Sequence, residues 1–217
     1  MFPSRKMSDR MRQANWYFDF ISPYSYFGLF ELARLGRDVS VEYRPVLFAG
    51  LLNHWGQRGP AEIPGKRTWT YRWCTWYAAQ RGIPFKLPQA HPFNPLGYLR
   101  LAIAANCEPA AIRRIFERLW TTGVDASDAR VLEELAASLG VAREQLAEPR
   151  VKEILRANSE AAIAQGVFGV PTLVVDGEVF WGADATDFAR AYLADRNVLD
   201  NEEMKRVSKL PVGASRL

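Results

Sequence analysis

Hydrophobic positions follow two different spacings along this chain. Near both ends, apolar residues form short runs or alternate with polar ones, which is typical of strands. Between about residues 64 and 166 they recur every three or four positions, which predicts helices throughout. The predicted strands are Asn15–Phe20, Val39–Arg44, Thr172–Val175 and Glu178–Trp181. Asp176-Gly177 between the last two is a favoured hairpin turn.

Helical spacing also follows the first strand, where Tyr26, Leu29, Phe30 and Ala33 share one face, and again at about Asp184–Ala194. A βαβ unit, a helical block and a ββα unit therefore follow one another. This order predicts the α/β class and a thioredoxin-like domain interrupted by a large all-helical insertion. We expect a flexible arm (1–14), two parts of that domain (15–60 and 167–196), the insertion (61–166) and a tail (197–217) that frays.

Composition is that of an ordinary globular protein. Of 217 residues, 48% are hydrophobic and 24% charged, and the formal net charge is +4. Basic residues form no dense stripe, so a small anionic ligand is favoured over nucleic acid. Residues 1–14 are basic and polar with no apolar segment, unlike a secretion signal or membrane anchor. We therefore expect a cytoplasmic protein with no membrane partner.

The cysteines and histidines are too few and too scattered for a metal centre. Cys74 and Cys107 lie far apart and form no Cys-x-x-Cys pair, and the histidines are His54 and His91. The sequence predicts no bound metal and no disulfide framework. We expect both cysteines to act as small buried apolar residues.

Ser22 is the most informative candidate, because it stands where the first strand should end and a helix begin. Ser22-Pro23 fits the N-cap and first position of a helix, since serine accepts a backbone hydrogen bond there and proline lacks the N–H. Unpaired N–H groups and the helix dipole would stabilise an anion beside the Ser22 hydroxyl. The alternative is that Ser22 is only a helix cap.

Three segments carry a resemblance to a known family. They are residues 17–26 (YFDFISPYSY), 91–96 (HPFNPL) and 166–172 (GVFGVPT), with 180–184 (FWGAD) as a further match. Together they resemble the 2-hydroxychromene-2-carboxylate isomerase family over about Asn15 to Ala194. That family belongs with the kappa-class glutathione transferases and is related to bacterial DsbA-like disulfide oxidoreductases. The resemblance implies glutathione as the cofactor.

In the oxidoreductases two cysteines occupy the positions of Ser22 and Ser25, so the resemblance excludes dithiol exchange here. It implies that Ser22 is the catalytic residue and donates a hydrogen bond to the glutathione thiolate, with help from the helix N-terminus. It also implies a cis Val170–Pro171 bond facing this turn, with Val170 pairing with the cysteinyl backbone of glutathione. Alternatively, Pro171 only marks the start of a strand.

Further glutathione contacts follow from the resemblance. Asp184 matches an aspartate that binds the γ-glutamyl end, and Lys66 matches a lysine near glutathione; a helix-start aspartate and a surface lysine are the ordinary alternatives. Gln57 stands where the kappa pattern has an asparagine contact. Two other positions depart from it, with Ala183 for a serine and Trp73 for an aspartate that crosses the dimer.

An aromatic stripe follows Lys66, formed by Trp69, Trp73, Trp76 and Tyr77. Such a stripe packs a core or subunit interface, or else Trp69 and Trp73 wall a flat substrate pocket. Phe48, His54 and Trp55, expected on the loop after the second strand, would close the same pocket. We interpret His91 as structural.

The resemblance implies an isomerase of aromatic catabolism that interconverts 2-hydroxychromene-2-carboxylate, or a related aromatic acid, and trans-o-hydroxybenzylidenepyruvate by reversible thiolate addition. Its partners would be a small aromatic carboxylate and a second copy in a homodimer. One alternative is a kappa-like glutathione transferase acting on aromatic or halogenated electrophiles. Another is a non-catalytic ligand-binding or scaffold protein of the same fold.

Overall fold

The computed structural model describes residues 11–214, so the first ten residues of the predicted arm lie outside the described part. One sheet of four strands forms its centre, in the order β2-β1-β3-β4. The strands are β1 (Arg12–Phe18), β2 (Val39–Pro45), β3 (Thr172–Val175) and β4 (Glu178–Trp181). β1 runs parallel to β2 and antiparallel to β3, and β4 runs antiparallel to β3. This mixed sheet confirms the predicted thioredoxin-like α/β fold.

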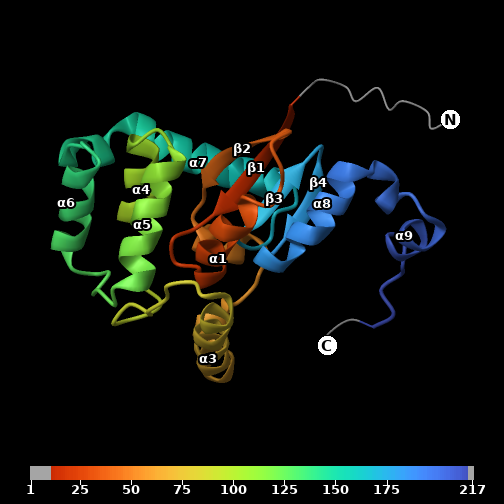
Figure 1. Ribbon diagram of the computed structural model, residues 1–217, viewed down its shortest axis with the longest axis horizontal. Coiled ribbons are helices and arrows are strands. Elements are labelled where there is room, and N and C mark those ends of the chain that lie inside the picture. The colour runs from red at the N-terminus through yellow and green to blue at the C-terminus, as the bar shows by residue number, and fades with distance from the viewer. Residues whose placement is uncertain (1–10, 215–217) are drawn as a thin grey trace.

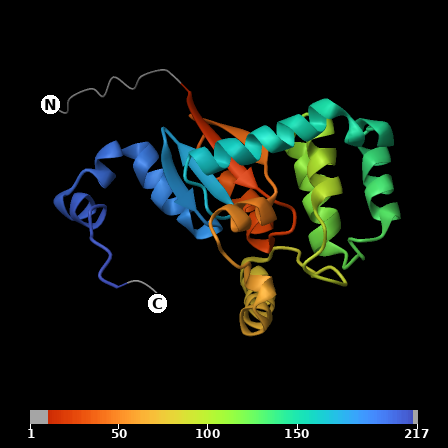
Figure 2. The same ribbon diagram turned by 180° about the vertical axis from the view of Figure 1, so that it is seen from behind.

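Helices cover both faces of the sheet. In Figure 1, α1 (Pro23–Leu32) and α8 (Thr186–Ala194) lie in front of the strands, whereas the view from behind in Figure 2 shows α7 (Pro149–Ala164) crossing the other face. Alternate residues of β1 serve the two faces, because Trp16 packs in the larger apolar cluster and Tyr17 in the smaller one. Burial on both faces explains why the last three residues of this strand, 16–18, are all aromatic.

Between β2 and β3 the chain is helical, as predicted. After α2 (Phe48–His54) the longer helices are α3 (Pro64–Arg81), α4 (Leu96–Ala104), α5 (Pro109–Thr121), α6 (Ala129–Ser138) and α7. Single 3-10 turns also occur, named η1 (Pro60–Glu62), η2 (Arg143–Ala147), η3 (Ala183–Ala185) and η4 (Arg196–Leu199). α4, α5 and α6 lie together at one end of the molecule, while α3 stands apart from the body in both views (Figures 1 and 2).

Three boundaries differ from the sequence-based prediction. β1 begins at Arg12, so residues 12–14 belong to the sheet and not to the flexible arm, and the strand ends at Phe18. Pairing with β2 begins at the first residue of β1, because the Arg12 N–H donates to the carbonyl of Asp38, the residue before β2. Phe48 and His54 lie on helix α2 instead of a loop, and Trp55 is the C-cap of that helix.

The tail also holds more structure than predicted, since η4 is followed by α9 (Glu202–Val207). Asn201 caps α9 through its side chain, acidic Glu202 and Glu203 occupy the first turn, and basic Lys205 and Arg206 the last. The acidic residues lie at the positive end of the helix dipole and the basic residues at its negative end. Together with the cap, these charges stabilise a short helix that has no apolar stripe. The expectation of a fraying tail is therefore wrong for these residues.

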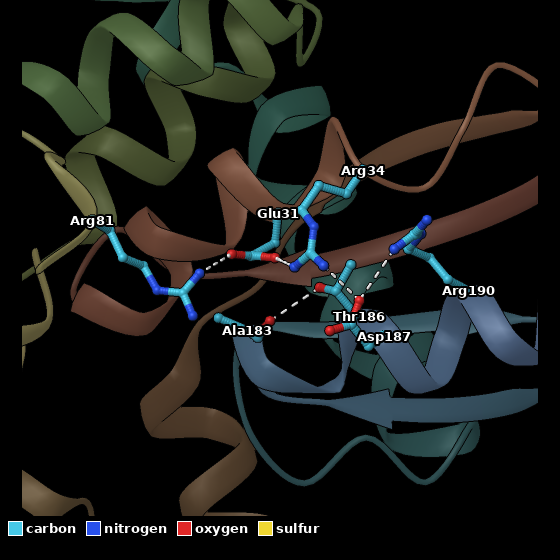
Figure 3. Close-up of polar contacts among 7 residues, drawn as sticks. All are labelled: Glu31, Arg34, Arg81, Ala183, Thr186, Asp187 and Arg190. Carbon is cyan, nitrogen blue, oxygen red and sulfur yellow. Dashed lines mark hydrogen bonds and ion pairs between the residues drawn. The ribbon is translucent and has the colours of Figure 1, made fainter.

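A buried carboxylate joins three helices around the central domain (Figure 3). Glu31 of α1 is 7% exposed and forms ion pairs with Arg34 and with Arg81 of α3. Arg34 also pairs with Asp187 of α8, at 2.6 Å. Because Glu31 is shared between two arginines, this network adds an ionic connection between α3 and the helix that begins after Ser22.

Candidate active site

Ser22 is the N-cap of α1, as its sequence context predicts. Its backbone is extended (φ −93°, ψ 117°), and its Oγ accepts from the Ser25 N–H at 3.2 Å. Pro23 takes the first helical position, where no N–H is needed. The Ser22 hydroxyl also donates to the Val170 carbonyl at 3.4 Å, at the long end of hydrogen-bond geometry. Its hydrogen can therefore be redirected to a stronger acceptor at small cost.

The segment before β3 completes this junction. The Val170–Pro171 peptide bond is cis, as the resemblance led us to expect, and both residues are buried. The Pro171 carbonyl accepts from the Gly182 N–H at 2.9 Å, which places η3 and its Asp184 beside the same loop. Residues more than 140 positions apart in sequence therefore meet at the start of α1.

Asp184 is exposed and lies within electrostatic range of α1 and α3. Burial raises the pKa of Tyr24 on α1 to about 12, and the negative charge of Asp184 adds to that rise. Burial likewise raises the pKa of Tyr77 on α3, again with a contribution from Asp184. The charge of Asp184 thus acts on tyrosines of both helices, and its exposed carboxylate is accessible to a cation from solvent.

Aromatic rings extend from the start of α1 onto α3. Tyr24 packs against Trp73 at a centroid distance of 5.5 Å, and Trp73 stacks on Trp69 at 6.1 Å and on Tyr77 at 4.6 Å. Trp69 is 60% exposed and Trp76 is 58% exposed. Within one chain, these two indoles belong to a surface and not to the core.

α2 approaches the junction from the other side. Phe48, at its first position, is half-buried, and the Trp55 indole donates to the Val167 carbonyl at 2.9 Å, three residues before Val170. His54 is exposed and meets Trp55 edge-on. The structure therefore brings Phe48 and Trp55 near the Ser22 junction and leaves His54 facing solvent.

Within the described residues, no side-chain hydrogen bond joins Lys66 or Gln57 to the residues around Ser22. Both are exposed, Lys66 in the first turn of α3 and Gln57 after α2. The Gln57 backbone N–H donates to the Leu52 carbonyl at 2.8 Å, which fixes its main chain only. Ala183, in contrast, is buried in η3 and offers no side-chain acceptor.

Asp19 is a buried acid at the junction that the sequence analysis did not single out. Its side chain is fully buried; Oδ1 accepts from the Ile21 N–H at 3.1 Å and Oδ2 from the Phe48 N–H at 2.8 Å. Burial raises the pKa of Asp19 to about 7, against the opposing effect of these backbone donors. Alternation of apolar and polar residues in the strand would instead have placed this aspartate in solvent.

This raised pKa predicts how stability depends on pH. Since folded Asp19 holds its proton more tightly than the unfolded chain, its contribution to stability is present below about pH 4 and is lost as pH rises through about 7. Chemical denaturation should show wild type losing on the order of 4 kcal/mol relative to Asp19→Asn across this window. A stability difference that stays constant with pH would contradict the buried acid.

His91 is a second titratable residue near Ser22, and it is half-buried. Its Nε2 lies 2.7 Å from the Ile21 carbonyl, and its Nδ1 lies 2.8 Å from the Tyr71 hydroxyl of α3. Burial lowers the pKa of His91, while the hydrogen bond to Ile21 opposes this. These contacts agree with the structural interpretation of His91. The indole of buried Trp120, on α5, donates to the neighbouring Phe20 carbonyl at 2.9 Å.

Neither cysteine is poised as a nucleophile. Both thiols are free, and burial raises the pKa of Cys74 to about 12 and of Cys107 to about 11.

Among residues 11–214, no three His, Cys, Asp or Glu side chains group as metal ligands. No helix in this same range is long and apolar enough to cross a membrane.

Comparison with known proteins gives consistent matches over most of the chain. The family model described as a DSBA-like thioredoxin domain matches residues 14–194. A 2-hydroxychromene-2-carboxylate isomerase of Sphingobium xenophagum is 30% identical over 191 residues, which cover 83% of this chain and 97% of that protein. Human glutathione S-transferase kappa 1 is 26% identical over 208 residues, covering 85% and 92%.

A solved structure shows the same fold. The structure of a 2-hydroxychromene-2-carboxylate isomerase superposes with a TM-score of 0.72 at 23% identity, covering 88% of this chain and 98% of that one. The likeness thus spans the sheet and the helical insertion together.

Proposed function

Because the chain belongs to the DsbA-like thioredoxin domain family, we propose that it is a glutathione-dependent isomerase of aromatic acids, with Ser22 as the catalytic residue. The observation that carries this proposal is the Ser22 hydroxyl, which stands at the N-terminus of α1 and is directed at the Val170 carbonyl over 3.4 Å. Relatives named as 2-hydroxychromene-2-carboxylate isomerase and as kappa-class glutathione transferase support it.

The residues present suit glutathione. The long Ser22 to Val170 bond leaves a hydroxyl hydrogen available for a sulfur anion, and the first turn of α1 favours negative charge. Exposed Asp184 suits the ammonium of a γ-glutamyl group, and exposed Lys66 suits a carboxylate. The Val170 backbone would pair with the cysteinyl backbone of glutathione, and the Gln57 side chain would offer glutathione an amide group.

When bound, glutathione would supply a sulfur nucleophile that adds reversibly to a conjugated double bond of the substrate, which permits rotation about that bond before the sulfur leaves. Ser22 would keep the sulfur deprotonated by donating its hydrogen bond. Trp69 and Trp73 would stack on the flat acid, with Phe48 and His54 at the opposite side. We include in this proposal a cytoplasmic setting and a homodimer that covers the exposed indoles of α3.

A direct assay separates this proposal from its alternatives. Purified protein with glutathione should convert 2-hydroxychromene-2-carboxylate to trans-o-hydroxybenzylidenepyruvate, followed by ultraviolet absorbance. A stable conjugate with a chloronitrobenzene, and no conversion of the chromene acid, would instead favour a kappa-like transferase. Calorimetry that detects no binding at millimolar glutathione would favour a scaffold protein.

Asp184→Asn tests the glutathione site separately from the chemistry. Loss of the carboxylate should weaken glutathione binding by about fivefold, since an ion pair to an exposed group contributes about 1 kcal/mol, and leave turnover at saturation nearly unchanged. Asp187→Asn, which alters an aspartate three residues later in the network of Figure 3, is the matched control and should bind as wild type. Equal affinity in all three proteins would contradict the placement of Asp184.

A further inference from the structure

Ile21, the residue before Ser22, has both of its backbone polar groups bound by titratable side chains, one from buried Asp19 and one from half-buried His91. Its N–H donates to Asp19 Oδ1 at 3.1 Å, and its carbonyl faces His91 Nε2 at 2.7 Å. The Ser22 N–H in turn donates to the Asp19 carbonyl at 3.1 Å. Asp19 and His91 therefore fix the main chain that leads to the Ser22 hydroxyl, and neither residue takes part in the proposed reaction.

The Asp19 contact is strongest with a carboxylate. Its two oxygens face two different donors, the N–H of Ile21 and the N–H of Phe48 at the start of α2. Protonation places a hydrogen on one of these oxygens and makes it a weaker acceptor, and asparagine replaces one oxygen by an NH₂ group that donates. Neutral Asp19 would therefore hold one of the two N–H groups, that of Ile21 or that of Phe48, less tightly.

The His91 contact requires a ring with its hydrogen on Nε2. A carbonyl oxygen only accepts, so the short contact to Ile21 sets Nε2 as the donor, while Nδ1 lies 2.8 Å from the Tyr71 hydroxyl, whose one hydrogen is donated to the His91 carbonyl. The same hydroxyl lies 2.8 Å from the His91 carbonyl. Tyr71 belongs to α3, so the helix with the aromatic residues also determines how His91 holds Ile21.

We propose that Asp19 and His91 are positioning residues for Ser22: they hold the Ile21 peptide from its two ends, and so direct the Ser22 hydroxyl toward a bound sulfur. The inference rests on the proposed function for the identity of that sulfur. It adds that thiolate activation depends on the helical insertion, because Tyr71 and His91 both belong to it.

The groups around this arrangement are mostly uncharged. Asp19 is surrounded by the backbone N–H groups of Phe48, Ile21 and Phe20, which favour its ionised form against burial. Aromatic rings pack against His91, namely Tyr71, Phe93 and Trp120. Arg67 acts on Tyr71, where it opposes the rise in pKa that burial causes. Asp19 is therefore the group whose ionisation changes the hold on Ile21.

Amide signals of the free protein provide the first test. In a ¹⁵N-resolved NMR titration, the Ile21 amide proton of wild type should shift as Asp19 ionises near neutral pH, and the shift should be absent in Asp19→Asn. His91→Leu should move the Ile21 and Ser22 signals, whereas His91→Gln, which keeps a donor, should restore most of the wild-type positions. Unchanged Ile21 and Ser22 signals in folded Asp19→Asn and His91→Leu would overturn the proposal.

The thiolate itself provides the second readout. Ultraviolet titration of bound glutathione should give a sulfur pKa about one unit higher in His91→Leu and Asp19→Asn than in wild type, with kcat lower by about ten- to a hundredfold. Asp128→Asn, which alters the half-buried N-cap of α6, is the control and should match wild type. Tyr71→Phe leaves a half-buried ring in place and tests the same contact if His91→Leu does not fold.

The two proposals fail in different ways. If wild type does not lower the pKa of the glutathione sulfur, the proposed function is wrong, and the amide signals still decide whether Asp19 and His91 hold Ile21. If wild type lowers that pKa and the folded variants lower it equally, the positioning role is wrong and the proposed function stands.

Discussion

Ser22→Ala is expected to lower kcat/KM for the chromene acid by about a hundred- to a thousandfold, the loss typical when one donor to a developing or resting anion is removed. The variant keeps the strand, the α1 backbone and the Val170–Pro171 segment, because the Ser22 hydroxyl makes one weak bond at 3.4 Å and one cap bond at 3.2 Å. Stability should therefore fall by only about 1 kcal/mol, as for an ordinary N-cap. Turnover at saturating glutathione measures the effect.

Ser25→Ala is the matched control for this variant. The substitution is chemically identical and lies one helical turn further along α1, but the Ser25 Oγ is fully buried and has no hydrogen-bond partner within the described residues. Its removal should leave activity unchanged and stability equal or slightly higher, since an unpaired buried hydroxyl costs free energy. Equal losses of activity in both variants would mean that the turn, and not the Ser22 hydroxyl, was disturbed.

Trp120→Ala should produce the largest loss of stability, about 3 to 5 kcal/mol, because the indole is completely buried and its removal leaves a cavity. The ring stacks on Phe85 at 5.7 Å, and its N–H is the donor to the Phe20 carbonyl in the turn before Ser22. Chemical denaturation gives the free energy of unfolding, and its midpoint should fall accordingly.

Two further tryptophan variants separate packing from the hydrogen bond. Trp76→Ala removes an indole that is 58% exposed in a single chain and should change the stability of the monomer by less than about 0.5 kcal/mol. Trp120→Phe keeps most of the ring and loses the donor to Phe20, which should cost about 1 to 3 kcal/mol. If Trp120→Ala unfolds at the same denaturant concentration as wild type, this contact between the insertion and the active-site turn contributes nothing to the fold.

Local rules explain why much of the fold could be predicted from sequence. Alternation and turn chemistry determine the hairpin at Asp176-Gly177, and the Ser22-Pro23 pair determines the start of α1. The family motif around Val170–Pro171 gave the cis bond, which base rates alone disfavour. Helix α2 was missed because seven residues without a side-chain N-cap have no distinct local signature.

The contacts that hold the Ser22 turn could not be found in this way. His91 meets Ile21 across 70 positions and Trp120 meets Phe20 across 100, and no periodicity reports such pairs. Asp19 stands between two phenylalanines, where alternation predicts exposure, yet its carboxylate is buried by the N-terminus of α2. Burial of these polar groups depends on tertiary packing, so only the structure shows it.

A crystal structure of the protein soaked with glutathione tests the central claim most directly. The account predicts that the sulfur lies within hydrogen-bonding distance of the Ser22 Oγ, with the cysteinyl backbone paired to Val170. A sulfur bound away from both residues would contradict it.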